Sequence, residues 1–161
     1  MHNLIFFMDA RASSSQIRGK LVLLKEGKYI AEYWASSGTV GNQDEHNQDD
    51  RAKGLLPSTV DLNGQQYVVL TKPIPMPSKP GIMGNFYKIN PHTVVINGVT
   101  RGDFGIHKDV RGSNKSMNAG TDGTLGCIGL LTDAGWAGFE SHMKAIASSG
   151  IVQIPLTVVF S

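Results

Sequence analysis

LVLLKEGKYIAEYWA, residues 21–35, decides the fold class of this chain. Two apolar runs, Leu21–Leu24 and Tyr29–Ala35, flank the polar segment Lys25–Lys28. Because glycine readily adopts the positive φ of a tight turn, we expect a β-hairpin with Gly27 in the turn. Outward from this hairpin, the sequence repeats short apolar runs separated by Gly, Pro, Asn and Ser. This pattern predicts a mainly β protein.

Further strands are expected where Val, Ile and aromatic residues gather. They are Leu4–Met8, Tyr67–Thr71, Thr93–Ile96, Phe104–His107 and Ile151–Phe160. Pro155 interrupts the last run, which predicts an edge strand or a bulge there. Between the strands, we interpret acidic Asn42–Lys53 as a solvated loop. Thr71–Gly84 carries four prolines, so we expect it to cross the surface in extended form.

One α-helix is predicted near the C-terminal end of the sequence. Thr132 is a suitable N-cap residue, and Gly150 supplies a stop. Between them, apolar residues recur at helical spacing and form one stripe for packing against the core: Trp136, Phe139, Met143 and Ile146.

The composition limits the classes of protein to which the chain can belong. Its 161 residues fit a single domain spanning 1–161. One cysteine excludes an intramolecular disulfide and a cysteine-cluster metal site, and a net charge of +2 does not indicate nucleic acid binding. No apolar run approaches the roughly 18 residues of an integral membrane segment. The apolar start ends at Asp9 with no basic segment before it, so we expect no secretory signal.

Cys127 and His107 are the candidate catalytic residues. A cysteine nucleophile reacts as the thiolate, and a neighbouring histidine can take the thiol proton and later return a proton to a leaving amine. This chemistry suggests a thiolate–imidazolium pair. The backbone N–H groups of Gly126 and Cys127 form a candidate oxyanion hole. By spacing alone, Cys127 also fits a small buried apolar residue.

GIHKD at 105–109 and TLGCIGL at 124–130 resemble the active-site signature of L,D-transpeptidase catalytic domains. In that family, a histidine on a strand is followed, after a glycine-rich loop, by Ser/Thr-X-Gly-Cys and an apolar residue. The matching residues are His107, Thr124, Gly126, Cys127 and Ile128. With the hairpin at 20–38 and the Gly-X-X-Pro segment at 53–58, the resemblance covers about residues 21–131. It implies an L,D-transpeptidase-like β-sandwich of mixed sheets with one α-helix after the catalytic cysteine loop.

The resemblance also implies a function. We expect a cysteine peptidase or acyltransferase that cleaves peptidoglycan stem peptides, or exchanges D-amino acids on them, through a Cys127 thioester without a cofactor or metal. The variant signature is similar to that of toxins injected by type VI secretion and of small bacteriophage lysis enzymes. Synthesis in the cytoplasm without a Sec signal, action in the periplasm or cell wall, and a cognate immunity protein or inhibitor as partner would follow. The alternatives are a transpeptidase that forms cross-links, and a non-catalytic wall-binding or virion structural module.

Two departures from the family pattern affect substrate binding. Leu125 stands where typical members have a second histidine, and Gly129 stands where they have an arginine that helps to hold the anionic stem peptide. Arg111 is therefore the first candidate for binding a substrate carboxylate. Lys108 and Arg101 are the next nearest basic residues, and each of the three also fits a solvated surface charge. Asp109 is the first candidate for orienting His107 and Asp122 the second, although a backbone carbonyl often does this in the family.

Overall fold

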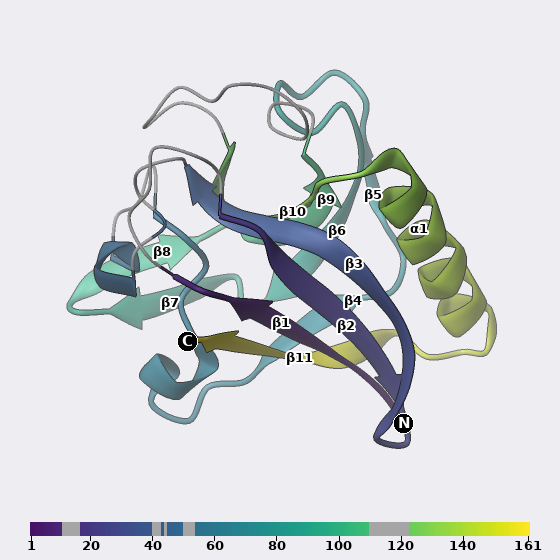
Figure 1. The fold of residues 1–161 in the computed structure, drawn as a ribbon, viewed down its shortest axis with the longest axis horizontal. Helices are drawn as coiled ribbons and strands as arrows, with labels where there is room; N and C mark the ends of the chain where they lie inside the picture. The colour runs from purple at the N-terminus through teal and green to yellow at the C-terminus, as the bar shows by residue number, and fades with distance from the viewer. Residues whose placement is uncertain (11–16, 40–42, 44, 50–53, 110–122) are drawn as a thin grey trace.

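The computed structural model describes residues 1–10, 17–39, 43, 45–49, 54–109 and 123–161 (Figure 1). This part of the chain is mainly β, with one α-helix, α1 (Asp133–Ser148), and two short 3-10 turns, η1 (Glu45–Asn47) and η2 (Thr59–Leu62). Its strands are β1 (His2–Met8), β2 (Gly19–Lys25), β3 (Lys28–Thr39), β4 (Tyr67–Leu70), β5 (Ile74–Met76), β6 (Gly84–Asn90), β7 (Thr93–Ile96), β8 (Val99–Gly102), β9 (Gly105–Lys108), β10 (Gly123–Leu130) and β11 (Gln153–Phe160).

The predicted hairpin is confirmed as β2 and β3. Lys25 pairs with Lys28, and the two residues between them both have positive φ, 51° at Glu26 and 73° at Gly27. A two-residue turn of this kind matches the right-handed twist of the strands that it joins. Strand β3 continues beyond the predicted end at Ala35 to Thr39, because its polar end pairs with β10.

The main sheet closes on itself. Its strand order is β4-β11-β1-β2-β3-β10-β9-β6-β5, and β4 also pairs with β6. This second pairing joins β4 and β6, so eight strands form a closed barrel and β5 extends from β6. The pairing is mixed, since β1 with β11 and β9 with β10 are parallel. A mainly β fold with mixed pairing is thus confirmed, whereas the expected two-layer sandwich is replaced by a barrel because β4 bridges β11 and β6.

Strand β11 lies inside the sheet, so the expectation of an edge strand at Pro155 is wrong. Pro155 pairs with Val68 of β4 without a register shift. The parallel register with β1 begins one residue later, at Leu156 opposite Leu4. The N–H that proline lacks therefore falls outside the stretch that pairs with β1.

Alternate side chains of the strands fill the barrel. An eight-stranded barrel has an interior just wide enough to be filled by side chains. Ten of its inward residues are at most 1% exposed: Leu4, Phe6, Leu21, Leu23, Val69, Ile89, Ile106, Ile128, Leu130 and Leu156. Because side chains alternate along a strand, the neighbours of these residues point outward, and His107 and Cys127 are among them.

The helix α1 is confirmed where the sequence predicted it. The Thr132 side chain accepts a hydrogen bond from the Gly135 N–H at 2.9 Å, and Gly150, with φ of 89°, follows its last turn. Phe139 is buried and meets the rings of Tyr33 and Tyr87 edge to face, with centroids 5.6 and 5.1 Å apart. Both tyrosines are buried strand residues, so the helix adds its apolar stripe to the barrel core.

Phe139→Ala should lower the free energy of unfolding by about 3–5 kcal/mol, because it removes a buried ring and leaves a cavity between two tyrosines. Urea denaturation followed by circular dichroism measures this change. Lys144→Ala, at an exposed position of the same helix, is the matched control and should change stability by no more than about 0.5 kcal/mol. Equal stability of the two variants would mean that α1 does not share the core.

Candidate active site

The two candidate catalytic residues lie on neighbouring strands, His107 on β9 and Cys127 on β10. The pairing of these strands is parallel, with Ile128 opposite Ile106 and Gly129 opposite His107. Cys127 lies just before this paired stretch, two residues before the partner of His107, and the register of β10 against β3 shifts between Gly123 and Ile128. Continued alternation from Ile128 to Cys127 places the thiol on the same outward face as His107. Diagonal neighbours on a sheet face have Cα atoms about 7–8 Å apart, a gap that long side chains can span. Cys127 lies within β10, and not in a loop as the sequence suggested.

The thiol of Cys127 is held by backbone groups at the start of β9. Its Sγ donates to the carbonyl oxygen of Asp103 at 3.8 Å. Cys127 is partly exposed, yet burial of the thiol raises its pKa to about 11. A backbone hydrogen bond with Gly105 and the positive charges of Arg101 and Lys79 act in the opposite direction, and burial exceeds them. The resting residue is therefore a thiol at neutral pH.

His107 is 5% exposed and has a defined tautomer. Its Nδ1 lies 2.8 Å from the carbonyl oxygen of Lys108, and its ring stacks on Phe86 with centroids 6.4 Å apart. Burial lowers the pKa of His107, against the opposing effects of the Lys108 carbonyl and the Asp109 charge. The ring is thus neutral at pH 7. Since a carbonyl only accepts, the proton sits on Nδ1, and Nε2 carries the lone pair of a general base.

These two pKa shifts contradict the thiolate–imidazolium pair that the sequence predicted for the resting site. A raised thiol pKa and a lowered imidazole pKa both favour the neutral forms. The resting site therefore holds Cys–SH and a neutral imidazole, and a proton moves to His107 only when the sulfur attacks.

The peptide group before Cys127 is fixed from one side. Gly126 has φ of 106°, and a Cβ added there would lie 2.5 Å from Nη2 of Arg101. The Ser37 hydroxyl donates to the Gly126 carbonyl at 3.4 Å, and it accepts from the Leu56 N–H at 2.8 Å. Because the C=O and N–H of a trans peptide point in opposite directions, the contact directs the Cys127 N–H away from Ser37. Because of its positive φ and the nearby Arg101 atom, Gly126 is a position that only glycine fits.

Arg101 is buried, so its interpretation as a solvated surface charge is wrong. It is 3% exposed and lies on β8. The guanidinium donates to the carbonyl oxygens of Gln48 at 2.6 Å, Gly54 at 3.1 Å and Leu55, and it lies 5.2 Å from the ring centroid of Phe104. The sequence offered one signal for this placement. Asn97-Gly98 is a strong hairpin turn, and pairing around it sets Arg101 opposite buried Val94.

The structure describes only some of the other predicted residues. Arg111 and Asp122 lie outside the described residues, and so does the side chain of Thr124, whose backbone belongs to β10. Asp109 is 1% exposed, but the partner of His107 Nδ1 is the Lys108 carbonyl, the alternative that the family pattern allowed. Lys108 forms an ion pair with Asp133 at the start of α1.

Two buried glutamines show that the acidic segment is not wholly solvated. Gln43 is 0% exposed and Gln48 is 8% exposed. The Gln43 amide donates to the Ser36 hydroxyl at 2.6 Å and to the Ser37 carbonyl at 3.0 Å. These contacts pack part of the segment against the polar end of β3, next to Gly126. Sequence polarity alone does not distinguish such buried amides from solvated ones.

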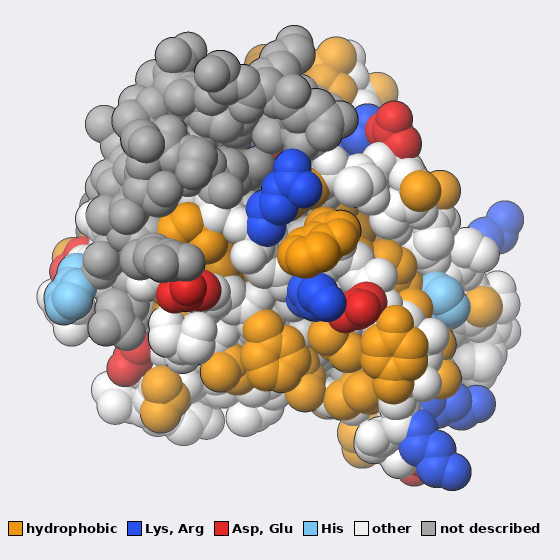
Figure 2. Space-filling view, viewed as in Figure 1, with side chains coloured by type: hydrophobic (Ala, Val, Ile, Leu, Met, Phe, Trp, Pro, Cys, Tyr) orange, Lys and Arg blue, Asp and Glu red, His pale blue; other side chains and the backbone are white. Residues whose placement is uncertain are grey.

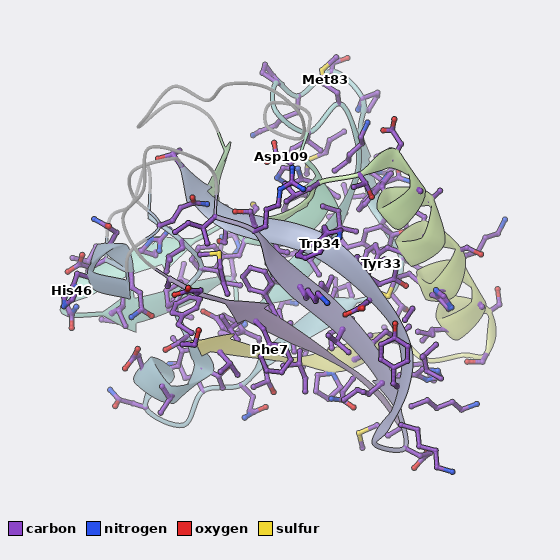
Figure 3. The ribbon with its side chains drawn as sticks, viewed as in Figure 1. Phe7, Tyr33, Trp34, His46, Met83 and Asp109 are labelled. Carbon is purple, nitrogen blue, oxygen red and sulfur yellow. The ribbon has the colours of Figure 1, made fainter. Side chains whose placement is uncertain are left out.

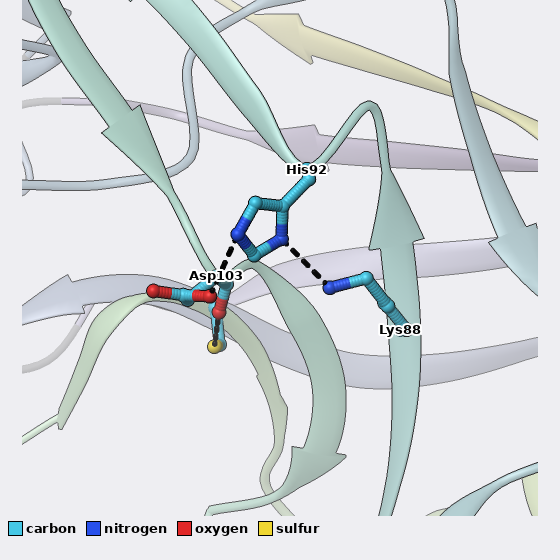
Figure 4. A network of polar contacts seen from close by, with 4 residues as sticks. Lys88, His92 and Asp103 are labelled. Atoms are coloured by element: carbon cyan, nitrogen blue, oxygen red, sulfur yellow. Dashed lines mark hydrogen bonds and ion pairs between the residues drawn. The ribbon is translucent and has the colours of Figure 1, made fainter.

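Asp103 contacts both the Cys127 thiol and a second histidine, His92, with different groups. His92 Nε2 lies 3.5 Å from the Asp103 carboxylate, and His92 Nδ1 lies 3.0 Å from the Lys88 amine (Figure 4). The backbone carbonyl of the same Asp103 accepts from the Cys127 thiol. The His92 and Asp103 side chains are 61% and 86% exposed, so solvent screens this pair.

The outer face of β1, β2 and β3 carries a shallow hollow of about 440 Å³. Trp34 and Phe7 are 47% and 45% exposed on this face, with basic side chains between and beside them (Figures 2 and 3). Arg18 and Lys20 line the hollow, and the Lys20 amine lies 5.0 Å from the centroid of the Trp34 ring. Trp34 points to the same face of the sheet as Cys127, since the Leu131 N–H donates to the Trp34 carbonyl.

Within the residues that the structure describes, no group of three or more His, Cys, Asp or Glu side chains gathers as a metal site. No described helix has the length and apolar character of a membrane span. No protein-family model matches the chain, and comparisons with curated proteins and with solved structures found no significant match.

The raised pKa of Cys127 predicts that its thiol reacts slowly with alkylating agents at neutral pH. We expect its alkylation by iodoacetamide to accelerate steadily from about pH 7 to about pH 10 with no plateau, because the folded thiol titrates near 11. The urea-unfolded chain, with an ordinary thiol pKa of about 8.5, is the control. As the chain has one cysteine, the whole signal belongs to Cys127. A plateau in the folded protein by about pH 8 would contradict the neutral resting pair.

Proposed function

We propose that this chain is a cysteine-dependent acyl-transfer enzyme that acts on peptidoglycan stem peptides, with an L,D-transpeptidase-like fold. The chemistry is supported by the position of Cys127 and His107 on neighbouring parallel strands, two residues apart in register, and by the hydrogen bond of His107 Nδ1 to a carbonyl. The substrate class rests on the resemblance of residues 105–109 and 124–130 to the family signature.

The first half-reaction forms a thioester. Nε2 of His107 takes the thiol proton as Sγ of Cys127 attacks the carbonyl carbon of the diaminopimelate-type residue, in the amide bond to the residue that follows it. The oxyanion is stabilised by backbone N–H groups at Gly126 and Cys127, each worth about 3–4 kcal/mol when well aligned. The C–N bond then breaks, and the amine leaves with the proton from His107. Protonation of His107 at low pH removes the base, so the rate falls as pH falls through its lowered pKa.

The second half-reaction decides the product. Water, deprotonated by His107, hydrolyses the thioester and leaves a shortened stem peptide with a free carboxylate. The amine of a D-amino acid gives exchange at the same position, and an amine from a second stem peptide gives a cross-link. We favour hydrolysis or exchange, because the variant signature, with Leu125 and Gly129 in place of the usual histidine and arginine, is similar to that of toxins and lysis enzymes that degrade or edit stem peptides. The proposed enzyme acts at the cell wall as an endolysin or a secreted antibacterial toxin.

The hollow beside Trp34 is the proposed path for the rest of the polymer. Leu131 lies next to Trp34, and Cys127 lies four residues before Leu131, about 13 Å along β10. An exposed indole can stack on a sugar ring or on peptide, while Arg18 and Lys20 offer cations to carboxylates. The hollow and the thiol thus share one face of the barrel.

Cys127→Ala should abolish the release or exchange of stem-peptide residues from purified sacculi, by at least about a thousandfold, since the nucleophile is lost. Mass spectrometry of muropeptide digests measures this and separates shortened stems, labelled D-amino acid exchange and new dimers. Equal activity of wild type and Cys127→Ala would contradict a mechanism with Cys127 as the nucleophile. Inactivity of both proteins on intact sacculi and on isolated muropeptides would favour a non-catalytic module.

Trp34→Ala should raise the KM for disaccharide-peptide fragments about fivefold or more and leave kcat nearly unchanged, because the ring binds substrate away from the reacting bond. Tyr29→Ala is the matched control, because Tyr29 is another exposed aromatic residue of β3 that lies outside the hollow. Steady-state kinetics on purified fragments measures both variants. The same KM for both would exclude the hollow from the substrate path.

A further inference from the structure

Arg101 places a buried positive charge beside the peptide group that precedes Cys127. Its Nη2 would lie 2.5 Å from a Cβ built on Gly126, and the residue is 3% exposed. The carbonyl oxygens of Gln48, Gly54 and Leu55 orient the guanidinium. These hydrogen bonds fix the position and the plane of the guanidinium.

Three charged side chains act on the Cys127 thiol within the part of the chain that the structure describes. Arg101 on β8 and Lys79, which follows β5, favour the thiolate, whereas Asp103 ahead of β9 opposes it. His107 on β9 is neutral in the resting protein, because burial lowers its pKa. Among these charged groups, Arg101 has the largest effect on the thiol. Its low exposure keeps solvent from screening that effect.

Arg101 also reaches Gly126 through hydrogen bonds. The guanidinium binds the carbonyls of Gly54 and Leu55, and the next N–H, that of Leu56, donates to the Ser37 hydroxyl. The same hydroxyl donates to the Gly126 carbonyl. The cation thus supports the chain segment that orients the candidate oxyanion-hole peptide.

We propose that Arg101 is a positioning residue of the Cys127 site, whose buried charge favours negative charge on the sulfur and whose hydrogen bonds hold the Gly126–Cys127 peptide. Its part in catalysis rests on the proposed function. Its effect on the thiol does not, because thiol ionisation exists without any substrate. The developing oxyanion of the first half-reaction receives the same electrostatic support as the thiolate.

Two variants separate charge from structure. Arg101→Gln removes the charge but keeps an amide that donates to carbonyls, and Arg101→Lys keeps the charge but loses the planar fork. Lys28→Met, at an exposed position in the β2–β3 hairpin, is the control for loss of a distant positive charge. The readouts are the iodoacetamide alkylation rate of Cys127 against pH and the urea midpoint. An osmolyte such as trimethylamine oxide supports the fold of a weakened variant during alkylation.

We expect Arg101→Gln to slow alkylation at about pH 9 by about three- to tenfold and to shift the profile to higher pH. Arg101→Lys should stay within about twofold of wild type, and Lys28→Met should match wild type. A purely structural role predicts reduced stability in both Arg101 variants with no difference between their alkylation profiles, and that result would overturn the proposal. If sacculi are not a substrate, activity is absent from all variants and from wild type while the alkylation difference persists.

Discussion

Parallel pairing of β10 with β9 sets Gly129 opposite His107, and the two-residue period of a strand then places Cys127 on the same face. A shift of that register by one residue would turn the thiol into the barrel and leave the histidine outside. The register is held by apolar residues on the inner face, since Ile106 and Ile128 are both fully buried there. Closure of the barrel by β4 limits sliding of these strands further, because no strand of a closed barrel moves alone. The candidate active site therefore depends on core packing on the opposite side of two strands.

Burial gives the site its electrostatic character. It raises the pKa of Cys127 and lowers the pKa of His107, so the resting pair is uncharged. A low-dielectric site also strengthens any charge–charge interaction that forms during the reaction. The buried guanidinium of Arg101 is set in place before any negative charge appears, as preorganised stabilisation requires. Slow reaction of the resting thiol with alkylating agents is therefore consistent with stabilisation of the transition state by the Arg101 charge.

Local signals in the sequence predict much of the fold. The β2–β3 hairpin, helix α1 and the strands β1, β4, β7, β9 and β11 follow from apolar runs, turn residues and capping residues. The sequence did not indicate β5, β6, β8 or β10, because these strands are short, proline-flanked or rich in glycine and polar residues. Barrel closure was also missed, since the pairing of β4 with β6 and β11 depends on contacts far apart in the sequence. Periodicity shows which face of a strand is buried, but not which strand will be its neighbour.

The candidate site likewise contains residues that local sequence signals predict and residues that only long-range contacts define. Cys127 and His107 were identified from motif residues. Arg101 was expected only as a carboxylate-binding residue or a surface charge, and Ser37 was not identified, because polar residues normally indicate surface. Turn chemistry at Asn97-Gly98 could have revealed the β7–β8 hairpin and the inward position of Arg101. No comparable local signal marks Ser37, whose role arises from contacts with Leu56 and Gly126.

The central claim is a covalent acyl-enzyme on Cys127. Intact-protein mass spectrometry after rapid mixing with a disaccharide-tetrapeptide, followed by acid quench and proteolytic mapping, tests it most directly. A thioester on Cys127 adds a mass equal to the substrate minus its leaving amino acid, confined to the peptide that contains Cys127 and absent from Cys127→Ala. Product formation at full rate by Cys127→Ala, or an acyl group mapped to any other residue, would contradict it.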